Sequence, residues 1–169
     1  SDAAIDGTMS DGTGGDGAAT DVHPVFSVSN FTVEVNPSNS LSYYVSWSTS
    51  EAVATELSVD CGSEYQHTFS DTTVGNERSE HEVFVMGLID GLSCTFTAHP
   101  QNPSVSGTRQ ETIERVGNLP ADLPVLSVNT VEAAAMQPGW TLWSVASFNG
   151  PDFLIIVVID AQGGYRWYY

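Results

Sequence analysis

Apolar residues recur at every second position through most of this chain, in short runs that turn residues separate. The clearest run is 41–47, where Leu41, Tyr43, Val45 and Trp47 fall on one face of an extended strand. No segment carries the three- to four-residue spacing of an amphipathic helix. The pattern predicts an all-β chain, with a fibronectin type III/Ig-like antiparallel sandwich over residues 23–116. Strands are predicted at residues 26–28, 31–35, 41–47, 56–60, 65–69, 82–86, 94–98 and 111–116.

The end of the chain is apolar in a different way. Residues 153–159 are apolar without alternation, which is typical of a strand that is buried on both faces. A glycine turn at 162–164 then leads into an aromatic strand at 165–169. Because an isolated two-stranded ribbon is marginal in water, we expect this hydrophobic hairpin to be covered by β-structure that this chain does not itself encode, from a missing remainder of the sheet or from another molecule. Its predicted assembly residues are Phe153, Leu154, Ile155, Ile156, Val157, Val158, Ile159, Trp167, Tyr168 and Tyr169.

Residues 1–22 form a low-complexity head rich in Gly, Asp, Thr and Ser. Such a composition buries too little apolar surface to offset the entropy of ordering, so a flexible tether is expected. The serines and threonines are candidate sites for glycans. Aspartates recur every five residues, and carboxylates are the hard oxygen ligands that calcium prefers. The weak calcium candidates are Asp6, Asp11, Asp16 and Asp21, although their spacing fits no EF-hand loop.

Residues 117–124 are predicted to link the sandwich to the C-terminal strands, which span residues 125–169. Pro120 and Pro124 favour an extended path in this linker. A further strand is predicted at 125–131, and residues 132–136 fit either a helical turn or an extended segment.

The chain is strongly acidic, and this property narrows the range of its partners. Its 169 residues include 21 Asp and Glu, four Arg and no Lys, which gives a net charge of −17. This balance argues against binding to nucleic acid, because phosphate contacts need clustered cations. It also argues against binding to an anionic membrane surface. No apolar stretch is long enough for a helical membrane span. Such acidity keeps a protein soluble and attracts divalent cations.

The two cysteines, Cys61 and Cys94, each lie at a predicted strand, and we expect a disulfide between them. Such bonds form in oxidising compartments, although intracellular proteins also carry cysteine pairs. Together with the lysine-free acidic composition, the pair predicts an extracellular or cell-surface location. The chain opens on polar residues at Ser1, as expected for a mature form after signal cleavage or for a lipoprotein trimmed of its lipidated cysteine.

Residue patterns for catalysis or metal binding are absent from the sequence. No His, Cys and Asp cluster has the spacing of a zinc site. A phosphate-binding loop of the GxxxxGK type needs a lysine, and the chain contains none. His67 and His81 are predicted at the surface, His81 because Glu80 and Glu82 flank it. Aromatic residues near the C-terminus are expected to pack in a core or an interface, with the stacking of sugars or phenols as the alternative. They are Trp140, Trp143, Tyr165, Trp167, Tyr168 and Tyr169.

Residues 83–98 resemble the fibronectin type III pattern, in which a leucine precedes a short turn and the next strand alternates into the core. Trp47 resembles the buried tryptophan that this family carries on an early strand. The family usually carries a tyrosine that braces the start of this strand, and Cys94 stands near its position. A bond from Cys61 to Cys94 would replace that brace and stabilise the fold by roughly 2–4 kcal/mol.

The C-terminal segment carries a second resemblance. Gly139-Trp140-Thr141-Leu142, the apolar strand ending at Asp160, the turn at Gly163-Gly164 and the pair Arg166-Trp167 are similar to the first blade of a bacterial arylsulfotransferase. That family joins an N-terminal β-sandwich to a six-bladed β-propeller. The resemblance implies transfer of sulfate between phenols through a histidine in later blades. None of the four histidines of this chain matches that position, so no catalytic residue is carried over.

These patterns predict two alternative functions. The first is a non-catalytic extracellular module that assembles with copies of itself, as a filament or surface layer, by adding strands at the hairpin. The alternative is the N-terminal part of an arylsulfotransferase-like enzyme whose catalytic propeller lies beyond Tyr169. No cofactor is expected in either case, apart from calcium at the weak candidates in the head.

Overall fold

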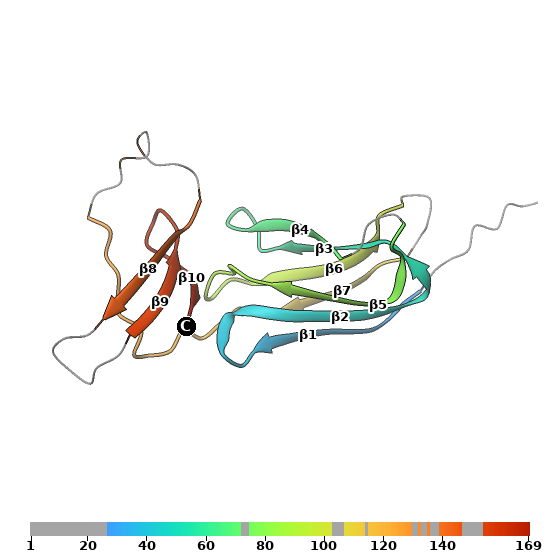
Figure 1. Ribbon diagram of the computed structural model, residues 1–169, viewed down its shortest axis with the longest axis horizontal. Helices are drawn as coiled ribbons and strands as arrows, with labels where there is room; N and C mark the ends of the chain where they lie inside the picture. Colours follow the sequence, from blue (N-terminus) through green and yellow to red (C-terminus); the bar gives the residue numbers. More distant parts are fainter. Residues whose placement is uncertain are drawn as a thin grey trace, which may run out of the picture.

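The computed structural model describes residues 27–71, 75–102, 107–113, 115–129, 132, 135, 139–146 and 154–169. Within these ranges the regular structure consists of ten β-strands and contains no helix (Figure 1). The predicted all-β class is therefore confirmed. Phe153 of the predicted hairpin lies outside the described residues, as do the calcium candidates Asp6, Asp11, Asp16 and Asp21.

Seven of these strands form a sandwich of two antiparallel sheets, as the alternating pattern predicts (Figure 1). The first sheet has the order β1-β2-β5, and the second has the order β4-β3-β6-β7. The register of β1 against β2 shifts between Ser29 and Thr32, where Asn30 has a φ of 51°. The bounds are β1 Val28–Asn36, β2 Asn39–Val53, β3 Thr55–Asp60, β4 Gln66–Ser70, β5 Arg78–Val85, β6 Cys94–Pro100 and β7 Arg109–Ile113.

The core of the sandwich forms where the inward faces of the two sheets meet. Leu41, Tyr43, Val45 and Trp47 of β2 are all buried, so the predicted inward face of this strand is confirmed. The ring centroid of Tyr43 lies 5.8 Å from that of Phe96 on the opposite sheet. Burying one large apolar side chain contributes about 1.5–3 kcal/mol, so this alternation decides which face of each strand turns inward. The opposite sheet contributes Leu57, Val59, Phe96 and Ala98 to the core.

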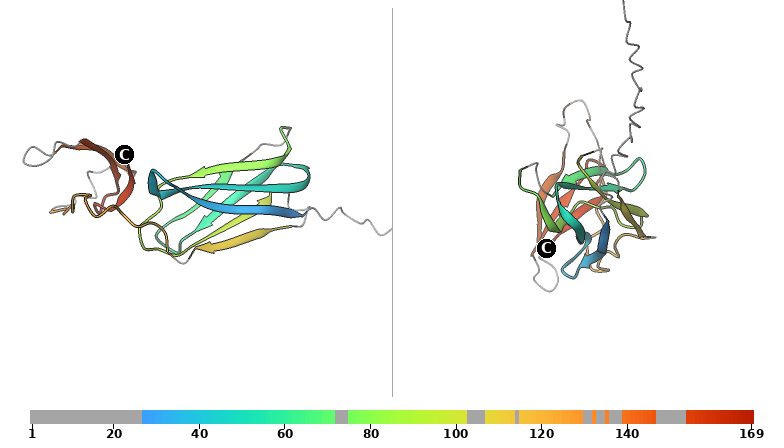
Figure 2. Two further views of the ribbon diagram at one scale, coloured as in Figure 1. Left: turned by 90° about the horizontal axis from the view of Figure 1, so that it is seen from below. Right: turned by 90° about the vertical axis from the view of Figure 1, so that its right-hand side faces the viewer.

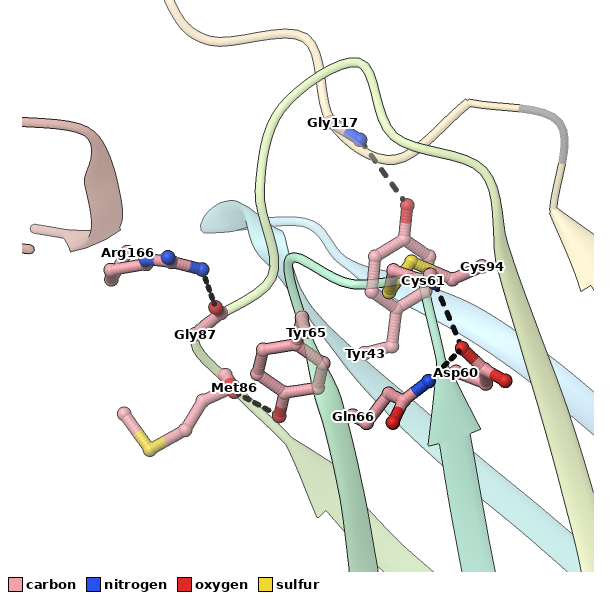
Figure 3. The surroundings of a disulfide bond; sticks show 11 residues. Tyr43, Asp60, Cys61, Tyr65, Gln66, Met86, Gly87, Cys94, Gly117 and Arg166 are labelled. Carbon is pink, nitrogen blue, oxygen red and sulfur yellow. Dashed lines mark hydrogen bonds between the residues drawn. A yellow bond between two sulfur atoms is a disulfide. The ribbon is translucent and has the colours of Figure 1, made fainter.

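A disulfide joins Cys61 to Cys94, as predicted from the sequence. Cys61 follows β3 directly, Cys94 opens β6, and both residues are buried. The bond lies close to Tyr43 and Tyr65, at the end of the sandwich that faces Arg166 of the C-terminal strands (Figure 3). It therefore ties two neighbouring strands of one sheet together at that end.

The C-terminal strands form a third sheet at one end of the sandwich (Figure 1, Figure 2). Its strands are β8 (Thr141–Ala146), β9 (Leu154–Ile159) and β10 (Tyr165–Tyr168), in the order β10-β9-β8. The predicted hairpin corresponds to β9 and β10. The edge strand β8 is an addition that alternation does not reveal, because each face of residues 141–146 mixes polar and apolar side chains.

The further strand predicted at 125–131 is not formed over residues 125–129, and residues 130 and 131 lie outside the described ranges. Both sides of the central strand β9 are already paired, one with β8 and the other with β10. Val125 is almost fully exposed, whereas Val128 packs against Gly163, where an added Cβ would collide with it. This segment therefore packs on the β9–β10 turn instead of joining a sheet.

Candidate functional site

One carboxylate organises the turn between β9 and β10. Asp160 accepts hydrogen bonds from the backbone N–H groups of Gln162 (2.9 Å) and Gly164 (2.8 Å), and from Nε of Arg166 (3.0 Å). Gly163 has a φ of 82°, a left-handed conformation that favours glycine. The glycine turn predicted from the sequence therefore forms around a paired acid and base, which places Arg166 at the start of β10.

Hydrogen bonds attach β10 to the sandwich and to the linker. The carbonyl of Tyr168 accepts from Nδ2 of Asn39 (2.6 Å), and its hydroxyl accepts from the backbone N–H of Ser40 (2.9 Å). The hydroxyl of Tyr165 donates to the carbonyl of Pro124 (2.6 Å). The strand β10 is thus held against the β1–β2 turn, and both the carbonyl and the hydroxyl of Tyr168 already have hydrogen-bond partners in the sandwich.

The two faces of the C-terminal sheet differ in their exposure. On one face Val157 is fully buried and Ile159 nearly so. On the opposite face, which we call the outer face, Leu142 is 70% exposed and Leu154 is 68% exposed. Contiguous exposed apolar side chains commonly mark an interaction site. The large apolar residues of the outer face are Leu142, Leu154, Ile156, Val158, Trp167 and Tyr169, with the last two rings stacked at a centroid distance of 6.1 Å.

The outer edge of β8 is open as far as the described residues show. Thr141 to Ala146 pair with β9 on one side, and no strand among the described residues pairs with the other side. Trp143 on this edge strand is 55% exposed. An unpaired edge offers a row of backbone N–H and C=O groups to another strand. The C-terminal sheet therefore combines an open edge with an exposed apolar face.

The structure divides the predicted assembly residues by their burial. Leu154, Ile156 and Tyr169 are exposed on the outer face, whereas Val157 and Ile159 are buried within the molecule. The remaining described members are half-buried, namely Ile155, Val158, Trp167 and Tyr168. Two further side chains are exposed on β8, Leu142 on the outer face and Trp143 on the opposite face, and the sequence signal that marks them is the apolar pair following Gly139.

His81 is buried, and the prediction of a surface histidine is wrong. Its Nδ1 lies 2.6 Å from Oδ2 of Asp71 and 2.9 Å from Oγ1 of Thr55, and its Nε2 lies 3.1 Å from Oγ1 of Thr49. Its ring stacks on Trp47, with ring centroids 5.1 Å apart and planes inclined by 10°. Asp71, Thr55 and Thr49 thus form a buried polar network around His81, and Trp47 covers one face of its ring.

The flanking glutamates misled the sequence prediction because successive residues of a strand face opposite sides. Glu80 and Glu82 are exposed, so His81 between them points inward. Thr49 donates its hydroxyl hydrogen to the carbonyl of Glu51 (2.7 Å), and therefore accepts from Nε2 of His81. The ring of His81 is thus held between Thr49 at Nε2 and the carboxylate of Asp71 at Nδ1.

Two tyrosines make the protein sensitive to alkaline pH. Burial raises the pKa of Tyr65 above its ordinary value of 10.0, with a smaller opposing effect of Arg166, and burial also raises the pKa of Tyr165. A group whose pKa is higher in the folded state stabilises the fold below its unfolded pKa, and this stability is lost as pH rises through the folded pKa. Both hydroxyls are also donors, to the carbonyls of Met86 and Pro124.

We therefore expect the free energy of unfolding to fall between about pH 9 and about pH 11. Urea unfolding at the two pH values measures this loss, and the double variant Tyr65→Phe/Tyr165→Phe should lose less over the same interval. An equal loss in the variant would assign the alkaline sensitivity to other groups.

Within the described ranges, no three His, Cys, Asp or Glu side chains gather closely enough to hold a metal ion. The part of the chain that the structure describes contains no helix that is long and apolar enough to cross a membrane. Comparison of the sequence with models of known protein families and with curated proteins finds no match. The surfaces of the molecule are therefore the basis for inferring its function.

Proposed function

We propose that this chain is a non-catalytic extracellular β-sandwich module that assembles with copies of itself through its C-terminal sheet. The observation that carries the proposal is the open edge of β8, beside the exposed side chains of Leu142 and Trp143. A strand of a second copy that pairs with this edge extends the sheet, and the copy that brings it covers the apolar outer face. The buried disulfide is compatible with an oxidising, extracellular setting.

The distribution of charge favours a second copy at this surface. Of the 21 acidic residues, only Asp152 and Asp160 fall within residues 139–169, which also contain Arg166. One arginine against two aspartates leaves this segment with −1 of the total charge of −17. Copies of so acidic a chain repel one another over most of their surface. The C-terminal sheet is therefore where two copies approach with the least repulsion.

The position of the sheet supports a head-to-tail arrangement. The sheet lies at one end of an elongated molecule (Figure 2), and the sandwich offers its edge strand β7 to the β8 edge of the next copy. A contact between two different surfaces does not close on itself, so it propagates into a filament. Pairing of two β8 edges with each other would instead give a closed dimer.

Self-association should increase with protein concentration and with salt. The charge of −17 opposes contact between copies at low ionic strength, and salt shortens this repulsion to about 8 Å at physiological strength. Sedimentation velocity should therefore show species larger than the monomer, and negative-stain microscopy should show filaments, at about 0.5 M salt. A monomer at every concentration and salt would refute the proposal.

Placing an acid on β8 should prevent assembly. The variants Leu142→Asp and Trp143→Asp put a carboxylate on an exposed position of the proposed contact, where it would be desolvated without a partner. The control is Val35→Asp, which makes the same kind of change at an exposed apolar residue of the sandwich strand β1. We expect the β8 variants to remain monomeric and Val35→Asp to assemble like the wild type. Equal assembly of all three would place the contact elsewhere.

The connectivity of the C-terminal sheet favours a second function. The strands β8, β9 and β10 follow one another in the chain and pair as an antiparallel meander, as strands do in the four-stranded blade of a propeller. The resemblance of this segment to the first blade of an arylsulfotransferase points the same way. The outer face would then pack on a following blade of a longer polypeptide, and catalysis would belong to that propeller.

The coding sequence downstream of the Tyr169 codon tests this alternative. Continuation through several blade-like repeats would support it, whereas an immediate stop codon would contradict it. In a longer protein of this kind, Leu142→Asp should lower the free energy of unfolding instead of preventing assembly, because Leu142 would then be buried.

A further inference from the structure

A cleft separates the C-terminal sheet from the sandwich on the side of β4. Its volume is about 500 Å³, which lies within the range of about 300–1,000 Å³ for ligand pockets in proteins. Tyr65 and β4 line it from the sandwich, and Trp140 and Arg166 line it from the C-terminal strands, with Met86 also contributing. Figure 3 shows Tyr65, Met86 and Arg166 near one another. Ligand sites commonly lie where two structural units meet in this way.

Aromatic rings and planar polar groups line this cleft together. The rings of Tyr65, Phe69 and Trp140 provide flat apolar surface. Glu64 and Gln66 provide a carboxylate and an amide, both of which are exposed. A ligand that fits such a lining has flat apolar faces and hydrogen-bonding groups around its rim.

Several of the lining groups are held in place without a ligand. The hydroxyl of Tyr65 donates to the carbonyl of Met86 at 3.0 Å. Arg166 donates from Nη1 to the carbonyl of Gly87 at 3.3 Å, in addition to its pairing with Asp160. The ring of Trp140 lies over Gly87, where an added Cβ would collide with it. Groups fixed in advance lose little entropy when a ligand binds, which favours affinity.

Charge narrows the class of ligand. The net charge of −17 opposes an anionic ligand, and Arg166 in the lining is already paired with Asp160, so it offers no free cation to hold one. We propose that the cleft binds a neutral saccharide. One face of the sugar ring stacks on Trp140, and its hydroxyl groups donate to Glu64 and exchange hydrogen bonds with Gln66. This inference is independent of self-assembly, because it concerns the cleft and not the edge of β8.

Titration of the 169-residue chain with neutral sugars tests the proposal. A suitable panel contains glucose, galactose, mannose, N-acetylglucosamine and short oligomers of each, with the indole N–H signals followed by NMR spectroscopy. Trp140→Phe assigns the Trp140 signal. We expect a saturable shift of this signal with at least one neutral sugar, and no shift of the buried Trp47.

Matched variants separate the cleft from the rest of the surface. Trp140→Ala should weaken binding about tenfold or more, and Gln66→Ala tests the same cleft at an exposed side chain whose own contact is one exposed hydrogen bond to Asp60 (3.2 Å). The controls are Trp143→Ala on β8 and Thr68→Ala on β4, neither of which lines the cleft. The proposal is overturned if no neutral sugar binds, if the controls weaken binding as much as the cleft variants, or if glucuronate binds more tightly than glucose.

Discussion

Replacing Asp71 by asparagine is expected to lower the free energy of unfolding by roughly 1–3 kcal/mol. The side chain of Asp71 is 1% exposed, and its Oδ2 lies 2.6 Å from Nδ1 of the fully buried His81. Asparagine keeps the size of the side chain but replaces one carboxylate oxygen by an NH2 group, so it cannot supply both of the acceptor oxygens that face Arg78 and His81. A buried polar group that is left without its partner destabilises the folded state by this amount. Urea unfolding followed by circular dichroism measures the loss.

Two further variants separate this effect from the loss of surface charge. Arg78 also pairs with Asp71, but its side chain is 51% exposed, so Arg78→Gln should cost about 1 kcal/mol or less. Glu80 is exposed and accepts one hydrogen bond from Ser48, so Glu80→Gln should stay within about 0.5 kcal/mol of the wild type. If Asp71→Asn costs no more than Glu80→Gln, the buried contacts of Asp71 with His81 and Arg78 contribute little to stability.

The expected size of the Asp71 effect follows from where the network lies. Thr49 is on β2 and His81 on β5 in one sheet, whereas Thr55 opens β3 in the other and Asp71 follows β4. The network therefore crosses the core and connects the two sheets. It does so at the start of β3, whereas the disulfide lies just beyond the end of that strand. The polar network and the disulfide therefore stabilise opposite ends of the sandwich.

Removal of the disulfide should have the second large effect. Cys61 and Cys94 are separated by 33 residues, and cross-linking a loop of this length removes about 3–4 kcal/mol of entropy from the unfolded chain. The variant Cys61→Ala/Cys94→Ala should lose about that much stability and melt on the order of 15–25 °C lower. Thermal unfolding followed by circular dichroism gives the comparison.

Reduction of the wild-type protein is the matched control, because it opens the bond without removing the sulfur atoms. Both cysteines are buried, so a reductant should leave the folded protein intact under native conditions and act once urea opens the sandwich. The reduced wild type should then unfold near the midpoint of the double variant. Melting of the double variant at the wild-type temperature would show that the bond contributes nothing to stability.

Sequence reasoning succeeded where burial depends on near neighbours along the chain. Alternation marked the inward face of β2, because a strand turns successive side chains to opposite sides. The same rule predicts that His81 points inward, because Glu80 and Glu82 on either side of it are exposed. The prediction of a surface position instead gave more weight to the charges of these two glutamates. For the candidate site, the unbroken apolar run located β9, but it did not tell Val157, which is buried, from Leu154, which is exposed.

The amino-acid sequence by itself determined that the chain is an all-β sandwich with a Cys61–Cys94 bond and an apolar C-terminal hairpin, because residue period and residue type carry that information. Only the tertiary structure decided that β8 is the outermost strand of the C-terminal sheet, with one edge that no described strand pairs with. It also decided that Asp71 contacts His81 in the core and that Trp140 and Tyr65 line one cleft. Each of these depends on contacts between segments far apart in the chain, and such contacts follow from which strands pair and pack.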